Sequence, residues 1–244
     1  MAARVLLIED DPSIARFVEM ALEDLSPPDA AAPAVSLQVV RDLAAAAAAL
    51  AEGDWQLVIS DLMLPDGSAE TLLAQGHAQA GAAPPWIIFS AGVNEARRQS
   101  LFASGVARVL HKPVPLQQLL DTVAELLWPG ATPAPAGLLP NDPVQQHFAG
   151  DRELFERFRA GCVERFADDI AEGEAAVAAS DVARLRRVAH GLKAVLELIG
   201  QPALAAQARA LEDSAAAWAP GQALPGGWPA LAQGLAALRG DPPA

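Results

Sequence analysis

Residues 57–67, Leu-Val-Ile-Ser-Asp-Leu-Met-Leu-Pro-Asp-Gly, decide the fold of the first half of the chain. The apolar run 57–59 does not alternate with polar residues, which predicts a strand buried on both faces of a parallel sheet. The run stops at Asp61, and Pro65 and Gly67 then turn the chain. We therefore expect Asp61 at the carboxyl end of a central strand, where open α/β sheets bind their ligands.

The same succession of strand, loop and helix repeats on both sides of this stretch. Strands are predicted near residues 5–8, 35–40, 57–61, 86–90 and 107–110, and helices near 12–25, 42–51, 69–78, 94–104 and 116–128. Strands that alternate with amphipathic helices form parallel βαβ units. The sequence therefore predicts a doubly wound, five-stranded parallel sheet over residues 1–128.

Composition limits the class of protein and its partners. The net charge of −13 and the pI near 4.6 argue against nucleic acid and anionic membranes as main partners, because both are polyanions. The single cysteine, Cys162, excludes an internal disulfide framework, and we expect it to be a small buried residue. No apolar run reaches the roughly 18 residues of a membrane span. We expect a soluble, cytoplasmic protein.

Residues 129–143 form a proline-rich break in composition. Proline-rich segments are extended and semi-rigid, so we expect a linker here, between a first domain at 1–128 and a second at 144–240.

Polar side chains stand where four of the predicted strands end: Glu9, Asp10, Asp61, Ser90 and Lys112. Parallel strands bring these ends to one edge of the sheet. Carboxylates about 4 Å apart repel by roughly 4 kcal/mol at an effective dielectric constant near 20, so the cluster needs a cation or raised pKa values. The ligands offered are all oxygens, which suits Mg²⁺. Asp61 would then act as a nucleophile toward a phosphoryl group whose oxygens Lys112 and Ser90 bind.

Residues 4–128 resemble a receiver domain of two-component signalling. The matching features are the acidic pair Glu9 and Asp10, Asp61 in Asp-Leu-Met-Leu-Pro-Asp-Gly, Ser90 in Phe-Ser-Ala-Gly, and Lys112 before Pro113. The resemblance implies a flavodoxin-like fold, Asp61 as phosphoacceptor and a cis Lys112–Pro113 bond. It also implies Mg²⁺ held by Glu9, Asp10, Asp61 and the main-chain carbonyl of Met63. Many receivers carry an aromatic residue where this chain has Val109, so we expect no coupling through a rotating ring.

Beyond residue 143 every apolar pattern is helical. Helices are predicted over residues 151–179 and 180–200, from residue 202 onward, and over 228–238, with a proline- and glycine-rich loop at 218–227. Antiparallel helices joined by short loops predict a four-helix bundle. The fold class is therefore α/β followed by all-α.

His190 is predicted on the outer side of the second of these helices. Arg186 and Lys193 lie one turn to either side of it, with Arg187 close by. An exposed imidazole among basic residues suits a nucleophile that enters an acidic pocket of another protein. The other histidines, His77, His111 and His147, lack this context and are expected to be surface or loop residues.

The sequence His190-Gly191-Leu192-Lys193-Ala194, followed by Gly200, is similar to the signature of histidine-containing phosphotransfer (Hpt) domains. The resemblance covers about residues 144–240. It implies that His190 carries a phosphoryl group, with Lys193 part of the same site.

The two resemblances together indicate a phosphorelay protein rather than an enzyme with a substrate of its own. Its partners would be a sensor histidine kinase or other receiver or Hpt proteins, and a homodimer through the receiver stays open. One alternative is an adaptor in which phosphorylation changes only how the bundle is presented and His190 is idle. A metal-dependent phosphatase is less favoured, because Met63 stands two residues after Asp61, where such an enzyme needs a second aspartate.

Overall fold

The computed structural model describes residues 2–23, 25, 33–79, 83–129 and 142–240. Two compact units divide the chain: residues 1–140 with 146–149 form the first, and residues 141–145 with 150–244 form the second. Residues 130–141, most of the predicted linker, lie outside the described residues. The proposed boundaries at 128 and 144 therefore stay predictions.

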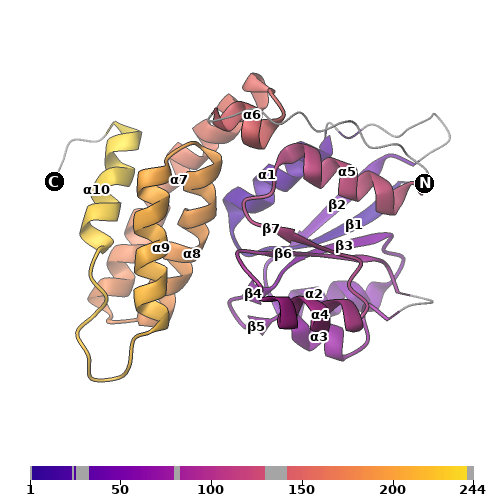
Figure 1. The fold of residues 1–244 in the computed structure, drawn as a ribbon, viewed down its shortest axis with the longest axis horizontal. Coiled ribbons are helices and arrows are strands. Elements are labelled where there is room, and N and C mark those ends of the chain that lie inside the picture. The colour runs from indigo at the N-terminus through magenta and orange to yellow at the C-terminus, as the bar shows by residue number, and fades with distance from the viewer. Residues whose placement is uncertain (1, 24, 26–32, 80–82, 130–141, 241–244) are drawn as a thin grey trace. The chain divides into compact units, whose positions relative to one another are not determined.

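The first unit is built on the predicted parallel sheet (Figure 1). Its strands are β1 (Ala3–Ile8), β2 (Val35–Val40), β3 (Leu57–Asp61), β6 (Trp86–Ser90) and β7 (Arg108–His111), in the spatial order β2-β1-β3-β6-β7. All neighbours pair in parallel. Every residue of β3 and β6 is buried, which explains why their sequences show no alternation. The predicted fold class is confirmed for this unit.

Helices cover both faces of the sheet. They are α1 (Pro12–Glu23), α2 (Leu43–Glu52), α3 (Glu70–Ala74), α4 (Glu95–Ala103) and α5 (Leu116–Leu127). Helices α1 and α5 lie on one face and α2, α3 and α4 on the other (Figure 1). The second face is closed by a core in which Leu6, Val58 and Ile88 from the strands pack with residues of the helices.

The region after Asp61 differs from the prediction in two ways. A short antiparallel hairpin, β4 (Met63–Leu64) and β5 (Gly67–Ser68), follows the strand directly. The helix predicted over residues 69–78 ends as α3 at Ala74. The chain turns at Gly76, whose φ of +89° is a left-handed conformation that ends helices.

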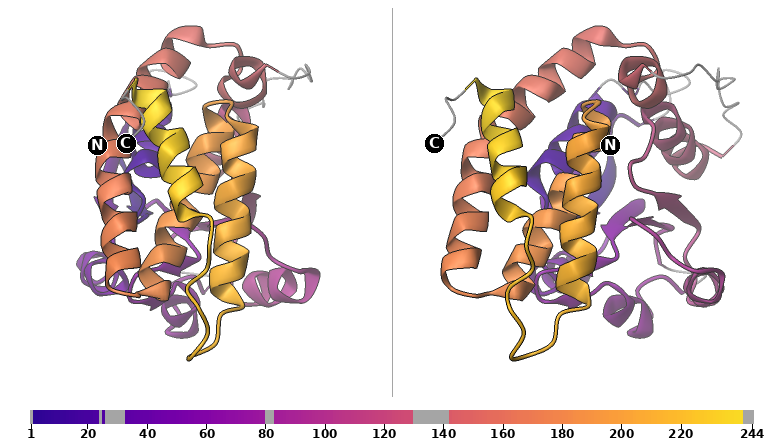
Figure 2. Two further views of the ribbon diagram at one scale, coloured as in Figure 1. Left: turned by 90° about the vertical axis from the view of Figure 1, so that its left-hand side faces the viewer. Right: turned by 60° about the vertical axis from the view of Figure 1, so that its left-hand side comes forward.

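The second unit is helical, as predicted. Its helices are α7 (Arg152–Ala178), α8 (Val182–Leu198), α9 (Pro202–Ala216) and α10 (Trp228–Arg239). Helix α8 packs against both α7 and α9, and α10 packs against α7 and α9, so the helices form a bundle (Figure 2). Asp151 and Asp181 cap α7 and α8 by accepting main-chain hydrogen bonds. Cys162 is buried, as expected.

A further helix, α6 (Pro143–Phe148), was not predicted. It contains His147, which is buried. The prediction that His147 is a surface or loop residue was therefore wrong, because the short helix turns this side chain inward.

Two glycines of α7 allow the packing of the bundle to be tested. A Cβ at Gly173 would overlap the ring of Trp228 on α10, whereas a Cβ at Gly161 meets nothing. We expect Gly173→Ala to destabilise the second unit by about 1–3 kcal/mol through overpacking. Gly161→Ala should stabilise it by about 0.5–1 kcal/mol, because alanine favours the helix. Calorimetric unfolding of the full chain measures both; equal effects of the two variants would contradict the packing described.

Candidate functional site

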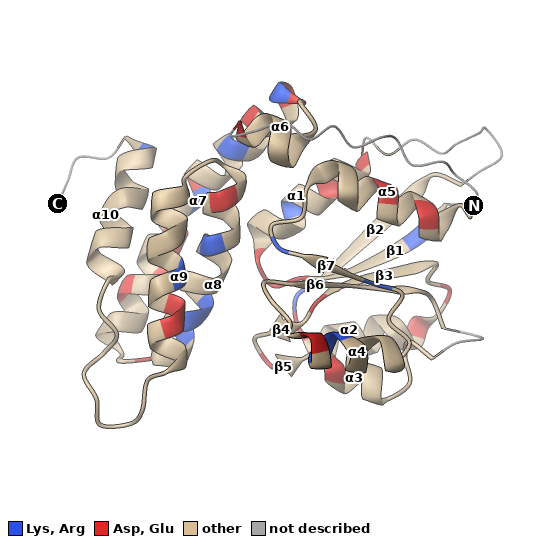
Figure 3. Cartoon of the chain, viewed as in Figure 1, with Lys and Arg blue, Asp and Glu red and all other residues tan. Residues whose placement is uncertain are grey.

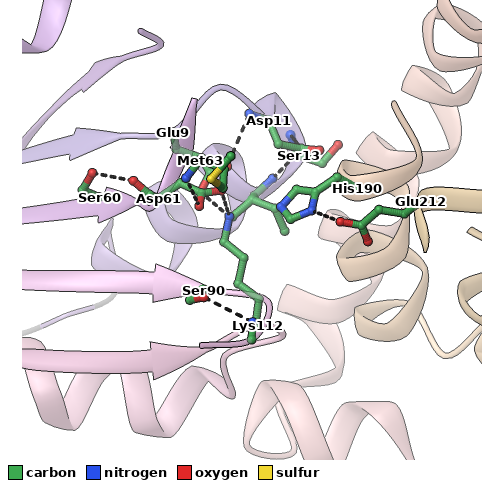
Figure 4. A network of polar contacts seen from close by, with 12 residues as sticks. Glu9, Asp11, Ser13, Ser60, Asp61, Met63, Ser90, Lys112, His190 and Glu212 are labelled. Carbon is green, nitrogen blue, oxygen red and sulfur yellow. Dashed lines mark hydrogen bonds and ion pairs between the residues drawn. The ribbon is translucent and has the colours of Figure 1, made fainter. Parts of the chain in front are cut away.

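The carboxyl ends of β1, β3 and β7 bring three charged side chains together. Lys112 Nζ lies 2.7 Å from Glu9 Oε2 and 2.6 Å from Asp61 Oδ2, and it donates a hydrogen bond to each (Figure 4). All three side chains are buried. A single ammonium group is thus shared between two carboxylates at the edge of the sheet, where the sequence predicted them.

The second oxygen of Asp61 is bound by the hairpin that follows it. The Met63 N–H donates to Asp61 Oδ1 at 3.1 Å. The carboxylate of Asp61 is therefore held from two sides, by Lys112 and by the main chain of β4. Met63 itself has an exposed side chain.

Ser90 reaches the same edge from β6. It pairs in register with His111, the residue before Lys112, and the Lys112 N–H donates to the Ser90 main-chain carbonyl at 2.8 Å. The Ser90 hydroxyl oxygen accepts a hydrogen bond from the Gly92 N–H at 3.2 Å. The Lys112–Pro113 peptide bond is cis, as the resemblance implied.

Asp10 and Asp11 have separate tasks. Asp11 Oδ1 accepts hydrogen bonds from the main-chain N–H groups of Ser13 and Ile14, at 2.8 and 3.1 Å, and so caps α1. Because Asp11 is the cap, Asp10 remains available as a ligand. Oxygen atoms of Glu9, Asp10 and Asp61 all lie within 4.8 Å of one another.

The electrostatics of the cluster fit a cation site. Burial raises the pKa of the Glu9 carboxyl well above its usual range, although Lys112 acts against this. Burial and the charge of Asp61 raise the pKa of Asp10. Burial alone would lower the pKa of Lys112, but the charges of Asp61 and Glu9 outweigh it and raise that pKa. Three oxygen donors with excess negative charge are the donor set that Mg²⁺ prefers.

The second unit holds His190 in a different arrangement. His190 Nδ1 lies 2.7 Å from Glu212 Oε1 (Figure 4). Lys193 Nζ lies 2.5 Å from Glu212 Oε2. An ionised carboxylate only accepts hydrogen bonds, so Nδ1 of His190 is the donor in this contact. Among the described residues nothing bonds to Nε2. The side chain of His190 is 27% exposed, so the imidazole is half-buried.

Glu212 is the functional candidate that the sequence reasoning missed. It is on α9, 22 residues after His190, and no spacing rule within one helix links the two. Partial burial would raise the pKa of Glu212, but hydrogen bonds from His190 and Lys193 and their charges lower it to about 2. Glu212 is therefore ionised at neutral pH.

The basic surroundings predicted for His190 are only partly present. Lys193 is buried and its charge is paired with Glu212, so it adds no exposed positive charge beside His190. The imidazole that was expected to be exposed is half-buried. Arg186 and Arg187 are exposed on α8 as predicted, and Figure 3 shows basic residues along this helix.

Comparison with protein families agrees with the two units. Residues 5–124 match the response regulator receiver domain, and residues 157–241 match the Hpt domain. The chain is a receiver–Hpt fusion. It is thus a two-component phosphorelay protein, and the predicted resemblance to both families is confirmed.

Solved receiver structures resemble the first unit of this receiver–Hpt protein. The signal receiver domain of a protein described as a Luxo repressor, from Vibrio parahaemolyticus, is 28% identical, with 52% of this chain and 91% of that chain covered and a TM-score of 0.46. A receiver domain of an HD domain-containing protein from Pseudomonas fluorescens is 26% identical, with 52% and 87% covered and a TM-score of 0.44. The chemotaxis response regulator CheY4 of Vibrio cholerae is 22% identical, with 52% and 100% covered and a TM-score of 0.44. No curated protein matches the chain.

Within the part of the receiver–Hpt chain that the structure describes, no helix combines the length and the apolar character needed to cross a bilayer.

Acidification should weaken the Hpt domain through Glu212. The pKa of Glu212 is about 2 in the folded protein, against an ordinary value of 4.5. The ionised carboxylate therefore stabilises the fold above about pH 4.5, and this contribution is lost as the pH falls toward 2. Over this range we expect the free energy of unfolding of the wild-type Hpt domain to fall by roughly 2 kcal/mol more than that of Glu212→Gln. Hydrogen exchange of α8 and α9 amides in the full chain, followed as the pH is lowered, measures it.

Glu197 supplies the matched control for this prediction. It joins the same two helices through an ion pair with Arg209 at 2.7 Å, but it does not contact His190. Glu197→Gln should retain the acid-dependent loss seen in wild type. If Glu212→Gln also retains it, the ionised Glu212 does not stabilise the bundle.

Proposed function

We propose that this protein transfers phosphoryl groups between aspartate and histidine, with Asp61 as the acceptor in the receiver and His190 as the carrier in the Hpt domain. The observation that supports this most is that charged side chains hold both reactive groups in place. Asp61 lies among carboxylates with one shared lysine. His190 has its Nδ1 bound to a carboxylate and its Nε2 unbonded among the described residues.

At Asp61 the reaction is an attack by a carboxylate oxygen on the phosphorus of a partner's phosphohistidine. A new P–O bond forms while the P–N bond breaks, and the electron pair of that bond stays on the leaving imidazole nitrogen. Lys112, 2.6 Å from Asp61 Oδ2, lies where it can neutralise the charge of the phosphoryl oxygens. The Ser90 hydroxyl accepts from Gly92, so its own proton is available for donation to a phosphoryl oxygen.

Glu9, Asp10 and Asp61 would hold Mg²⁺, with the Met63 carbonyl as the further ligand that the resemblance implies. When bound, the ion supplies positive charge that offsets the repulsion between the acceptor carboxylate and the incoming phosphoryl oxygens. The side chains of this cluster fit that role because they offer oxygen ligands alone.

At His190 the lone pair of Nε2 attacks the phosphorus of an aspartyl phosphate. The P–N bond forms, the acyl P–O bond breaks, and the carboxylate of the donor aspartate is regenerated; the reverse reaction returns the group. Glu212 positions the ring by holding the proton on Nδ1, 2.7 Å from its Oε1, which leaves Nε2 as the nucleophile.

The partners of such a protein are a sensor histidine kinase and other receiver or Hpt proteins. Receiver sites of the kind described here are acidic, and Arg186 and Arg187 give the surface of α8 beside His190 the opposite sign. Opposite charges steer the encounter of the two sites. A homodimer through the receiver is a further open proposal.

A labelling experiment on the full chain tests the proposed function. With Mg²⁺ and a small phosphodonor, we expect label on Asp61 that is lost in base, because an acyl phosphate hydrolyses there. Incubation with a phosphorylated partner receiver should place label on His190 that survives base and is lost in acid. Asp61→Asn should abolish the first label, and His190→Gln the second.

His77→Gln is the matched control, because His77 is another partly exposed histidine outside both sites. It should be labelled like wild type. If His190 of wild type neither accepts base-stable label from a phosphorylated receiver nor passes it to one, His190 is idle and the adaptor function is favoured instead.

A further inference from the structure

The hairpin that follows the phosphoacceptor is fastened to a neighbouring helix. Its strands pair Met63 with Ser68 and Leu64 with Gly67, so Asp66 stands in the tight turn between them. The carboxylate of Asp66 reaches the first turn of α2. Its Oδ1 accepts from the Leu43 N–H at 2.9 Å, and its Oδ2 accepts from the Ala44 N–H at 3.2 Å.

Helix α2 already has a cap of its own. Asp42 Oδ1 accepts from the Ala45 N–H at 2.7 Å, and the Asp42 main-chain carbonyl accepts from the Ala46 N–H at 3.0 Å. One N-cap residue is enough for most helices. The two hydrogen bonds that Asp66 accepts span 23 and 22 residues of sequence, so besides completing the cap they fix the hairpin to the helix.

Packing at the next residue supports the same attachment. Gly67 has a φ of +148°, and a Cβ built there would lie 2.9 Å from Leu43 Cδ1. The turn therefore approaches the start of α2 closely enough that only glycine fits without adjustment. Leu64 of the hairpin is buried in the same core, against which Leu43 also packs.

The other end of the hairpin binds the phosphoacceptor. The Met63 N–H donates to Asp61 Oδ1, and Met63 also carries the main-chain carbonyl proposed as a metal ligand. The position of Met63 depends on the hairpin, and the hairpin is held by Asp66. A chain of contacts thus runs from the first turn of α2 through Asp66 and Met63 to Asp61.

We infer that Asp66 is a positioning residue for the phosphoryl and metal site: it clamps the hairpin to α2 and thereby fixes the Met63 main chain against Asp61. The inference rests on the proposed function of Asp61. Asp66 is exposed and touches no reacting atom, so its effect passes through Met63. Partners that orient a metal site from outside commonly change metal affinity by 10–100-fold when removed.

Asp66→Ala and Asp42→Ala in the full chain test this inference as a matched pair. Both remove a side-chain cap of α2, but only the first releases the hairpin. We expect Asp66→Ala to weaken Mg²⁺ binding, followed by backbone NMR signals during titration with MgCl₂, by on the order of tenfold. Asp42→Ala should leave the affinity unchanged. Asp66→Asn keeps one acceptor oxygen, so its Mg²⁺ affinity should lie between those of Asp66→Ala and wild type.

A second readout needs no metal. Amide hydrogen exchange at Met63 should accelerate in Asp66→Ala and stay at the wild-type rate in Asp42→Ala, while the first turn of α2 loses protection in both. Equal Mg²⁺ affinity and equal Met63 exchange in the two variants would overturn the inference. If Asp61→Asn at the same time abolishes Mg²⁺ binding, the proposed function survives that result.

Failure of the proposed site gives a different pattern. Wild type would then bind no Mg²⁺ at Asp61, so Asp66→Ala could not lower the Mg²⁺ affinity. In that case the exchange rate of Met63 decides between the alternatives: a wild-type rate in Asp66→Ala contradicts the clamp, and a faster rate retains the clamp while the metal site is rejected.

Discussion

The ammonium group of Lys112, shared between the buried carboxylates of Glu9 and Asp61, is the interaction on which the rest of the receiver depends. A buried carboxylate without a partner is costly, and two of them side by side are more so. Lys112 lies within 2.7 Å of both, and these residues come from the ends of β1, β3 and β7. The buried carboxylate of Asp61 is therefore tolerated at the carboxyl edge of the sheet because Lys112, at the end of β7, supplies a compensating positive charge.

That compensation is incomplete. Glu9, Asp10 and Asp61 carry three negative charges when ionised and Lys112 carries one positive charge, so the cluster is short of two positive charges. Burial raises the pKa values of Glu9 and Asp10, and the charge of Asp61 adds to this. A divalent cation bound to the three carboxylates would remove the charge deficit. The deficit links the stability of the site to its chemistry.

Much of this arrangement could be predicted from the sequence because it follows from periodicity. The unbroken apolar runs of β3 and β6 indicate strands buried on both faces, and parallel strands bring Glu9, Asp61 and Lys112 to one edge. The helical spacing of apolar residues after residue 143 likewise predicted a bundle. Asp151 and Asp181 cap two of its helices.

The contacts that sequence did not predict join segments for which no periodic rule exists. Asp66 binds α2 across a turn that reads only as a loop, and Glu212 binds His190 from the next helix. Helix α3 is short because Gly76 turns the chain, although apolar spacing continued beyond it. His147 and Lys193 are buried although both are polar. The burial of a polar side chain depends on local packing, which the spacing of apolar residues does not predict.

The two proposed sites solve one electrostatic problem with opposite signs. In the receiver one cation serves two acids, so the nucleophile is an anion whose excess charge must be offset before a phosphoryl group can approach. In the Hpt domain one acid, Glu212, serves two bases, His190 and Lys193. There the nucleophile is a ring nitrogen, and the hydrogen bonds that Glu212 accepts from His190 and Lys193 keep it ionised. In the proposed transfer, a phosphoryl group would leave a site where carboxylates outnumber cations for one where a single carboxylate lies between two bases.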